Sequence, residues 1–88
     1  MIAQSAVEAR LAACANLLGE ITSFYWWNGQ VQNGAEHAVL FKTRKDLFPA
    51  LKEHILAQHS YDCPCIIAWD IADGHPPYLD WIKVETTA

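Results

Sequence analysis

The sequence constrains the fold most strongly near residue 28, where a strand-like tract meets a tight-turn dipeptide. Residues 21–27 read Ile-Thr-Ser-Phe-Tyr-Trp-Trp, and β-branched and aromatic residues are typical of strands. Asn28-Gly29 follows, which is the favoured dipeptide of a two-residue hairpin turn. Successive strand residues point to opposite faces, so this tract predicts a long β-hairpin with aromatic side chains on both faces.

Two further apolar runs predict strands. Ala38-Val39-Leu40-Phe41 follows the hairpin turn, and residues 65–71 form a second short run. Between the turn and the first run, Asn33-Gly34 interrupts the alternation, so we expect a bulge or a second turn there.

Three segments have helical spacing. Residues 5–14 carry apolar side chains at Val7, Leu11 and Cys14. A second helix is expected after Thr43 or Asp46 as the N-cap. A short terminal helix follows the loop signals Asp73-Gly74 and Pro76-Pro77, with apolar positions at Tyr78, Leu79 and Ile82.

The expected order is therefore α-β-β-α-β-α. One additional strand ahead of the first helix would give the twice-repeated split βαβ pattern of a ferredoxin-like α+β fold. The length of 88 residues predicts a single domain over residues 1–88.

The apolar content is high for so short a chain. Hydrophobic residues make up 52% of the sequence, and four of them are Trp. A chain of this size buries only about 60% of the surface that its unfolded form exposes, which favours oligomerisation. We therefore predict that Phe24, Tyr25, Trp26 and Trp27 form a subunit interface. The alternative is that these residues form an intramolecular core under the helices. Both interpretations can be correct at once, one for each face of the hairpin.

Charge and cysteine usage exclude several classes of protein. The formal net charge is −4 without a basic stripe, so no nucleic-acid partner is expected. Three cysteines, two of them one residue apart, do not make a disulfide framework. No signal peptide, membrane span or catalytic motif is recognised. We expect a cytoplasmic protein that is not an enzyme and has no membrane partner.

One group of residues could bind a metal ion. Cys63 and Cys65 would point to the same side of an extended segment, and His59 is nearby in sequence. Two thiolates and an imidazole suit Cu(I) or Zn(II), and Asp62 could add an oxygen ligand. The alternative is that both cysteines fill small half-buried positions at a strand start. Cys14, at the expected helix end, is interpreted as a core residue.

In a trimer, a second group could line a cleft between subunits that holds a small anion. Lys42 and Arg44 end a predicted strand, and three aromatic residues, Tyr61, Tyr78 and Trp81, are expected near its neighbours. The alternative is a capping segment with solvated charges and packed aromatic rings. No phosphate-binding glycine loop accompanies these residues.

Several of these segments together resemble the CutA, or divalent-cation tolerance, family of the PII-like superfamily. The matching segments, in family order, are Arg10–Asn16, Ser23–Gly29, Lys42–Arg44 with Leu47-Phe48, His59–Tyr61 with Pro64 and Ile66-Ile67, and Gly74 with Tyr78–Trp81. The resemblance implies a ferredoxin-like fold and a homotrimer formed through the long hairpin and sheet edges. It also implies an association with tolerance of copper and other divalent metals, without an established reaction. Related PII proteins bind nucleotides between subunits.

The sequence departs from the family pattern at two places. The family has a central strand before the first helix, between the strand at 65–71 and the one ending near Lys42. Met1 falls inside or just before that helix, so we expect the first strand to be missing or supplied by another segment or chain. Cys65 also stands where the family often has an acidic residue after the proline, so metal ligands carry over poorly.

Overall fold

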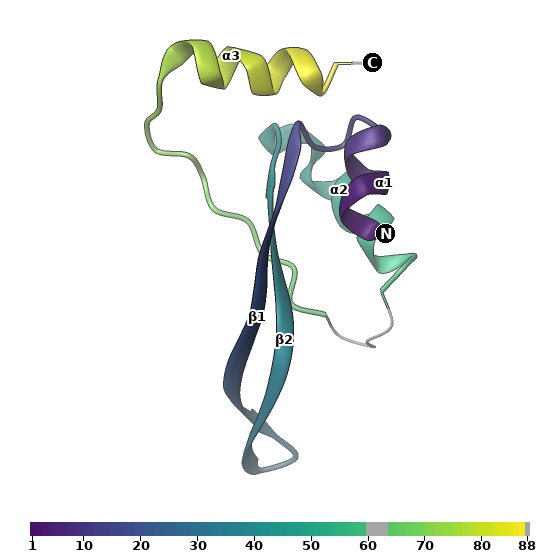
Figure 1. Cartoon of the computed structure of the whole chain (residues 1–88), viewed down its shortest axis with the longest axis vertical. Coiled ribbons are helices and arrows are strands. Elements are labelled where there is room, and N and C mark those ends of the chain that lie inside the picture. The colour runs from purple at the N-terminus through teal and green to yellow at the C-terminus, as the bar shows by residue number, and fades with distance from the viewer. Residues whose placement is uncertain (60–63, 88) are drawn as a thin grey trace.

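The structure is a long two-stranded hairpin with helices gathered at its open end (Figure 1). It is a computed structural model that describes residues 1–59 and 64–87. Among those residues the elements are α1 (Ile2–Glu8), β1 (Cys14–Trp27), β2 (Gln30–Lys42), a 3₁₀ turn η1 (Lys45–Leu47), α2 (Phe48–Leu56) and α3 (Pro76–Glu85). This mixture of helices and an antiparallel hairpin confirms the α+β class.

The hairpin turn forms where the sequence predicts it. β1 and β2 pair antiparallel from Trp27↔Gln30 at the turn to Cys14↔Lys42 at the open end. Asn28 and Gly29 have φ angles of 51° and 74°. A type I′ turn needs positive φ at both central residues, and Asn-Gly meets that need with least strain.

The expected irregularity at Asn33-Gly34 is wrong. These two residues pair regularly with Phe24 and Ser23, and the register shift lies instead between Leu17 and Gly19. Gly19 has a φ of 86°, a conformation that glycine adopts without a Cβ penalty. The bulge therefore lies where a glycine interrupts β1 rather than where Asn-Gly interrupts β2.

The first helix is shorter than the predicted 5–14 segment. α1 ends at Glu8, and Arg10 adopts a φ of 63°, which is incompatible with continuing a right-handed helix. The Leu11 N–H donates to the Ala6 carbonyl at 3.0 Å, as in a helix-terminating turn. Cys14 is therefore the half-buried first residue of β1 and does not lie at a helix end.

Residues 65–71 do not form the predicted strand. The segment from residue 64 to 75 is extended (Figure 1), but within the described part of the chain no backbone hydrogen bond joins residues 64–74 to another element. A strand exists only through a ladder with a neighbour. The apolar run was identified correctly, whereas its pairing partner is absent from the described residues.

The core is small and lies between the helices and the open end of the hairpin. Ala6, Leu51 and Ile55 form its buried cluster, and Phe41 and Ile66 pack against it. No large side chain among the described residues is completely buried. The radius of gyration is 14.7 Å, compared with about 12 Å for a compact chain of this length. The hairpin therefore projects from the body that its own chain provides.

Two arginines hold the end of α3. The Arg10 guanidinium donates to the Glu85 carboxylate at 2.8 Å and to the Glu85 carbonyl at 3.2 Å. Arg44 donates to the Thr86 carbonyl at 3.4 Å. Cations at a helix C-terminus satisfy its free carbonyls and oppose its dipole, so these contacts place α3 against the loops around the hairpin's open end.

Candidate functional site

The aromatic tract of the hairpin is exposed on both faces. Phe24 and Trp26 lie on one face and are 73% and 74% exposed, while Tyr25 and Trp27 on the other are 41% and 57% exposed. No helix covers this part of β1 in Figure 1. The alternative, an intramolecular core on one face, is not found in the single chain, because the described helices pack only at the other end of the hairpin.

At the hairpin's open end, β1, β2 and α3 bring four side chains together. Lys42 lies over the Tyr78 ring, with Nζ 5.5 Å from the ring centroid. Tyr78 stacks on Trp81 at a centroid distance of 5.5 Å, and the Cys14 thiol lies 4.0 Å from the Tyr78 hydroxyl. Three of the five predicted cleft residues, Lys42, Tyr78 and Trp81, are thus neighbours.

The aromatic contact also affects the charge of Lys42. A side-chain hydrogen bond to the Tyr78 hydroxyl, and then the coulombic interactions with Cys14 and Tyr78, raise the pKa of the Lys42 ammonium above its usual value of 10.5. Lys42 therefore stays protonated throughout the physiological range. A permanent cation beside two aromatic rings is a reasonable contact for a small anion.

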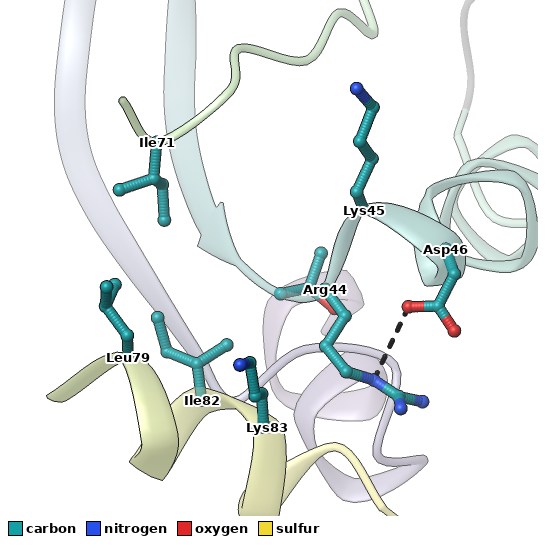
Figure 2. A pocket seen from close by; sticks show the side chains of 8 residues that line it. Arg44, Lys45, Asp46, Ile71, Leu79, Ile82 and Lys83 are labelled. Atoms are coloured by element: carbon teal, nitrogen blue, oxygen red, sulfur yellow. Dashed lines mark ion pairs between the residues drawn. The ribbon is translucent and has the colours of Figure 1, made fainter. Parts of the chain in front are cut away.

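Arg44 lies elsewhere, in a pocket beside the apolar face of α3 (Figure 2). The pocket has a volume of about 500 Å³ and is lined by Thr43, Arg44, Lys45, Asp46, Ile71, Leu79, Ile82 and Lys83. β2 ends just before this set, η1 contributes the next residues, and α3 forms the opposite wall. The structure thus separates Arg44 from the aromatic members of the predicted cleft, and Tyr61 lies outside the described residues.

The guanidinium of Arg44 is incompletely paired. Its Nε lies 3.6 Å from the Asp46 carboxylate (dashed in Figure 2), beyond hydrogen-bond distance. Nε is buried and has no hydrogen-bond partner in the described part of the chain. A buried donor without an acceptor is unfavourable, although another nitrogen of the same guanidinium donates to the Thr86 carbonyl.

The proposed metal ligands are only partly within the described residues. His59 is half-buried and Cys65 is exposed, whereas Cys63 and Asp62 lie outside the described residues. Among residues 1–59 and 64–87 there is no group of three or more His, Cys, Asp or Glu side chains that could hold a metal ion. The complete set that the sequence predicts, which needs Cys63, stays a prediction.

A polar cluster that the sequence did not predict joins α1 to α2. The Ser5 hydroxyl lies 2.9 Å from His54 Nε2 and also donates to the Ile2 carbonyl at 3.0 Å. The Gln58 amide lies 2.8 Å from the same imidazole nitrogen. Ser5 and His54 are 49 residues apart, and no sequence spacing could have indicated their contact.

The sequence analysis also did not identify the residues that line the pocket, because they are distant in sequence. The spacing of three of them is nevertheless a weak indication. Leu79, Ile82 and Lys83 have the i, i+3, i+4 spacing that places residues on one helix face. That pattern could have linked Lys83 to an apolar surface. It could not have indicated that Arg44 and Ile71 lie opposite.

Comparison with known protein families assigns the chain. The family model described as "CutA1 divalent ion tolerance protein" matches residues 1–85. The chain belongs to the CutA1 family. The divalent-cation tolerance protein CutA of Thermus thermophilus is 46% identical over 85 residues, which cover 97% of this chain and 82% of that protein. Its solved structure matches with a TM-score of 0.94 at 45% identity, covering 98% of this chain and 84% of the other.

Other relatives belong to the same family, but they differ in length and in the cellular location that their names give. The structure of the periplasmic divalent cation tolerance protein CutA of Archaeoglobus fulgidus matches with a TM-score of 0.93 at 40% identity, over 98% of this chain and 83% of that one. The chloroplastic protein CutA 1 of Oryza sativa is 46% identical over 97% of this chain. The chain spans about half the length of the rice and mouse relatives, 48% in each case. No helix in the described residues of this CutA1-family chain is long and apolar enough to cross a membrane.

Proposed function

We propose that this CutA1-family chain is a non-catalytic subunit of a homotrimer that contributes to tolerance of divalent metals, copper in particular, in the cytoplasm. The observation that carries the proposal is the exposed aromatic hairpin together with the family match. The names of the relatives refer to divalent-cation tolerance. The protein would act by binding metal or as an assembly scaffold.

The solvent-accessible surface supports assembly in a ring. The chain exposes 6719 Å², whereas a folded monomer of 9.9 kDa is expected to expose about 5,200 Å². The excess is about 1,500 Å². In a cyclic trimer each subunit contributes to two interfaces, and a standard interface buries about 800 Å² per partner. The excess area therefore has the size of two such contacts.

We further propose that the complete subunit has a ferredoxin-like sheet. The unpaired outer edge of β2 and the extended segment 65–71 would be joined by a central strand from another segment or chain. The support is the unsatisfied backbone of that segment within the described residues. Each unpaired backbone group that becomes buried costs about 1–3 kcal/mol, so an assembled protein would favour pairing over leaving the edges open.

Metal binding is tested by titration with Zn(II) and, without oxygen, with Cu(I), each in competition with a coloured chelator. We expect Cys63→Ser/Cys65→Ser to lose most of the affinity, because two of the three proposed ligands are removed. Cys14→Ser is the matched control and should bind as the unmodified chain does. An unchanged affinity in the double variant would remove the proposed metal site.

A second candidate is a PII-like sensor that binds a small anion in a cleft between subunits. The observation in its favour is the contact of Lys42 with Tyr78 and Trp81 at the open end of the hairpin. Thermal-shift measurements with metal ions and with small carboxylates or nucleotides separate the two candidates. A ligand-dependent rise in melting temperature for only one class identifies the function.

A further inference from the structure

The chain contains two Asn-Gly dipeptides, and the hairpin holds them in different backbone conformations. Asn28-Gly29 forms the two-residue turn, where both residues have positive φ angles, 51° and 74°. Asn33-Gly34 lies within β2 and pairs in regular register with β1. The same dipeptide therefore occurs once at the tip of the hairpin and once inside its ladder, so any difference in reactivity has a structural cause.

An asparagine followed by glycine can lose its side-chain amide without an enzyme. Hydroxide removes the proton of the glycine backbone nitrogen, which then attacks Cγ of the asparagine. A new C–N bond forms, the bond from Cγ to the side-chain nitrogen breaks, and that nitrogen leaves as ammonia. Water then opens the resulting succinimide at either of its carbonyls, which gives aspartate or isoaspartate. Glycine favours the attack because it has no Cβ to hinder it or to restrict the backbone.

The backbone nitrogen of Gly29 is available for this attack. In a two-residue hairpin the ladder begins at the residues that flank the turn, here Trp27 and Gln30, so the N–H of Gly29 takes no part in it. Asn28 and Gly29 are both exposed. A Cβ built on Gly29 would meet no described atom within 4 Å apart from its chain neighbours. The tip is also remote from the helices in Figure 1, so the turn can change conformation without breaking contacts to the rest of the chain.

The backbone nitrogen of Gly34 is not available in the same way. Antiparallel ladder pairs alternate between hydrogen-bonded and non-hydrogen-bonded kinds. Counted from Trp27↔Gln30, the hydrogen-bonded pair that closes the turn, Ser23↔Gly34 is again of the hydrogen-bonded kind. Gly34 is also only half-exposed, and a Cβ built on it would lie 3.4 Å from the Tyr25 hydroxyl. Attack at this site requires the ladder to open, which costs more free energy than motion at the tip.

We propose that Asn28 is a site of spontaneous deamidation, which converts the hairpin tip to isoaspartate or aspartate while the ladder protects Asn33. The two products differ in their effect on the turn. Asp-Gly is itself a favoured dipeptide of two-residue turns, so aspartate keeps the turn and adds one negative charge. Isoaspartate adds a carbon atom to the main chain. Because turn length fixes the register of a hairpin, this product should disturb the pairing of Trp27 with Gln30.

The inference goes beyond the proposed function and does not depend on it. The reaction consumes water and needs hydroxide, but it needs neither a metal ion nor a second copy of the chain. Its site lies directly beside Trp27, the last residue of the aromatic tract. Peptide mapping detects the product whether or not the chain assembles or binds metal, so failure of this inference and failure of the proposed function are distinguishable.

The test is incubation of the folded full chain at mildly alkaline pH, followed by mass-spectrometric peptide mapping that distinguishes Asn28 from Asn33. We expect the initial rate at Asn28 to exceed that at Asn33 by at least about tenfold, because attack by Gly34 first breaks the two hydrogen bonds of its ladder pair. In the chain unfolded by guanidinium the two rates should agree within about twofold, since the ladder is absent. An isoaspartyl-specific carboxyl methyltransferase should label the incubated folded chain.

Two variants serve as matched controls for the site. Asn28→Gly produces Gly-Gly, which also forms two-residue turns, and it should remove nearly all of the isoaspartyl label. Asn33→Gln should leave the rate at Asn28 unchanged. The proposal is wrong if Asn28 and Asn33 react equally fast in the folded chain, if Asn33 reacts faster, or if Asn28→Gly retains the label.

A third variant separates the altered backbone from the added charge. Asn28→Asp carries the charge of the aspartyl product on a normal main chain, so its melting temperature should stay near that of the unmodified chain. The isoaspartyl chain, purified after incubation, should melt at a lower temperature. Equal melting temperatures for these two chains would contradict the proposed effect on the turn.

Discussion

Truncation of Trp26 tests whether the hairpin is an assembly surface. A buried aromatic side chain covers about 150–250 Å², so the 74% of Trp26 that is exposed in the single chain amounts to roughly 150 Å². At about 25 cal/mol per Å², burial of this area contributes up to about 4 kcal/mol. Alanine retains part of the contact, so we expect Trp26→Ala to cost about 2–3 kcal/mol per subunit.

The effect on assembly is larger, because a trimer contains the substitution three times. The total is about 6–9 kcal/mol per trimer. The subunit concentration at half-dissociation varies with the square root of the trimer dissociation constant. It should therefore increase by about a hundredfold or more. Sedimentation over a dilution series measures this shift, and Trp26→Phe, which keeps most of the ring area, should move it much less.

Trp69→Ala is the matched control. Trp69 is the same side chain with nearly the same exposure, 76%, but it lies on the extended segment 64–75. We expect a smaller shift than for Trp26→Ala. A single species with the mass of one chain at every concentration would refute the reasoning, as would equal shifts for the two variants.

Three further predictions concern single contacts. Thr43→Val removes a 2.7 Å hydrogen bond to the Leu11 carbonyl and should lower the free energy of unfolding by about 1–2 kcal/mol in urea denaturation; an unchanged midpoint would contradict it. Gly74→Ala adds a Cβ only 2.9 Å from a side-chain carbon of α3. The free energy of unfolding should therefore fall by about 1–3 kcal/mol in the same assay. A more stable variant would contradict this and show that α3 moves to accommodate the methyl group. Tyr78→Phe should lower the NMR-measured pKa of Lys42, since the hydrogen bond that the Lys42 ammonium donates to the Tyr78 hydroxyl is the largest cause of the raised pKa. Because the folded-state pKa is raised, the contribution of Lys42 to stability is fully present below pH 10.5 and is lost as pH rises through the folded pKa.

The elements that were predictable from sequence are those with a local cause. Asn28-Gly29 forms the turn because its two residues tolerate positive φ, and this preference does not depend on the rest of the chain. The terminal helix α3 was also predicted, but it begins at Pro76, so Pro76 and Pro77 form its first turn and not the loop before it. The turn and the helix thus form at or next to the residues predicted for them.

The features that were missed depend on distant partners. Residues 65–71 have the composition of a strand, but pairing requires a neighbour that the described residues do not contain. The early end of α1 depends on the left-handed conformation of Arg10, which is uncommon for a residue with a Cβ. In the candidate site, Lys42 and Tyr78 were assigned to one possible cleft, but their direct contact was not predicted. The apolar residues opposite Arg44 could not be predicted either, because they face it only through the position of α3 in the fold.

The projecting hairpin has a consequence for mixed populations of subunits. Few contacts join the aromatic tract of the hairpin to the rest of its own chain. Its conformation is therefore stabilised mainly by the subunit that packs against it. In the proposed trimer, one subunit with a substitution in its aromatic tract would lower the stability of the two unmodified subunits that pack against it. A minority of altered chains, co-expressed with normal ones, would then lower the melting temperature of the majority.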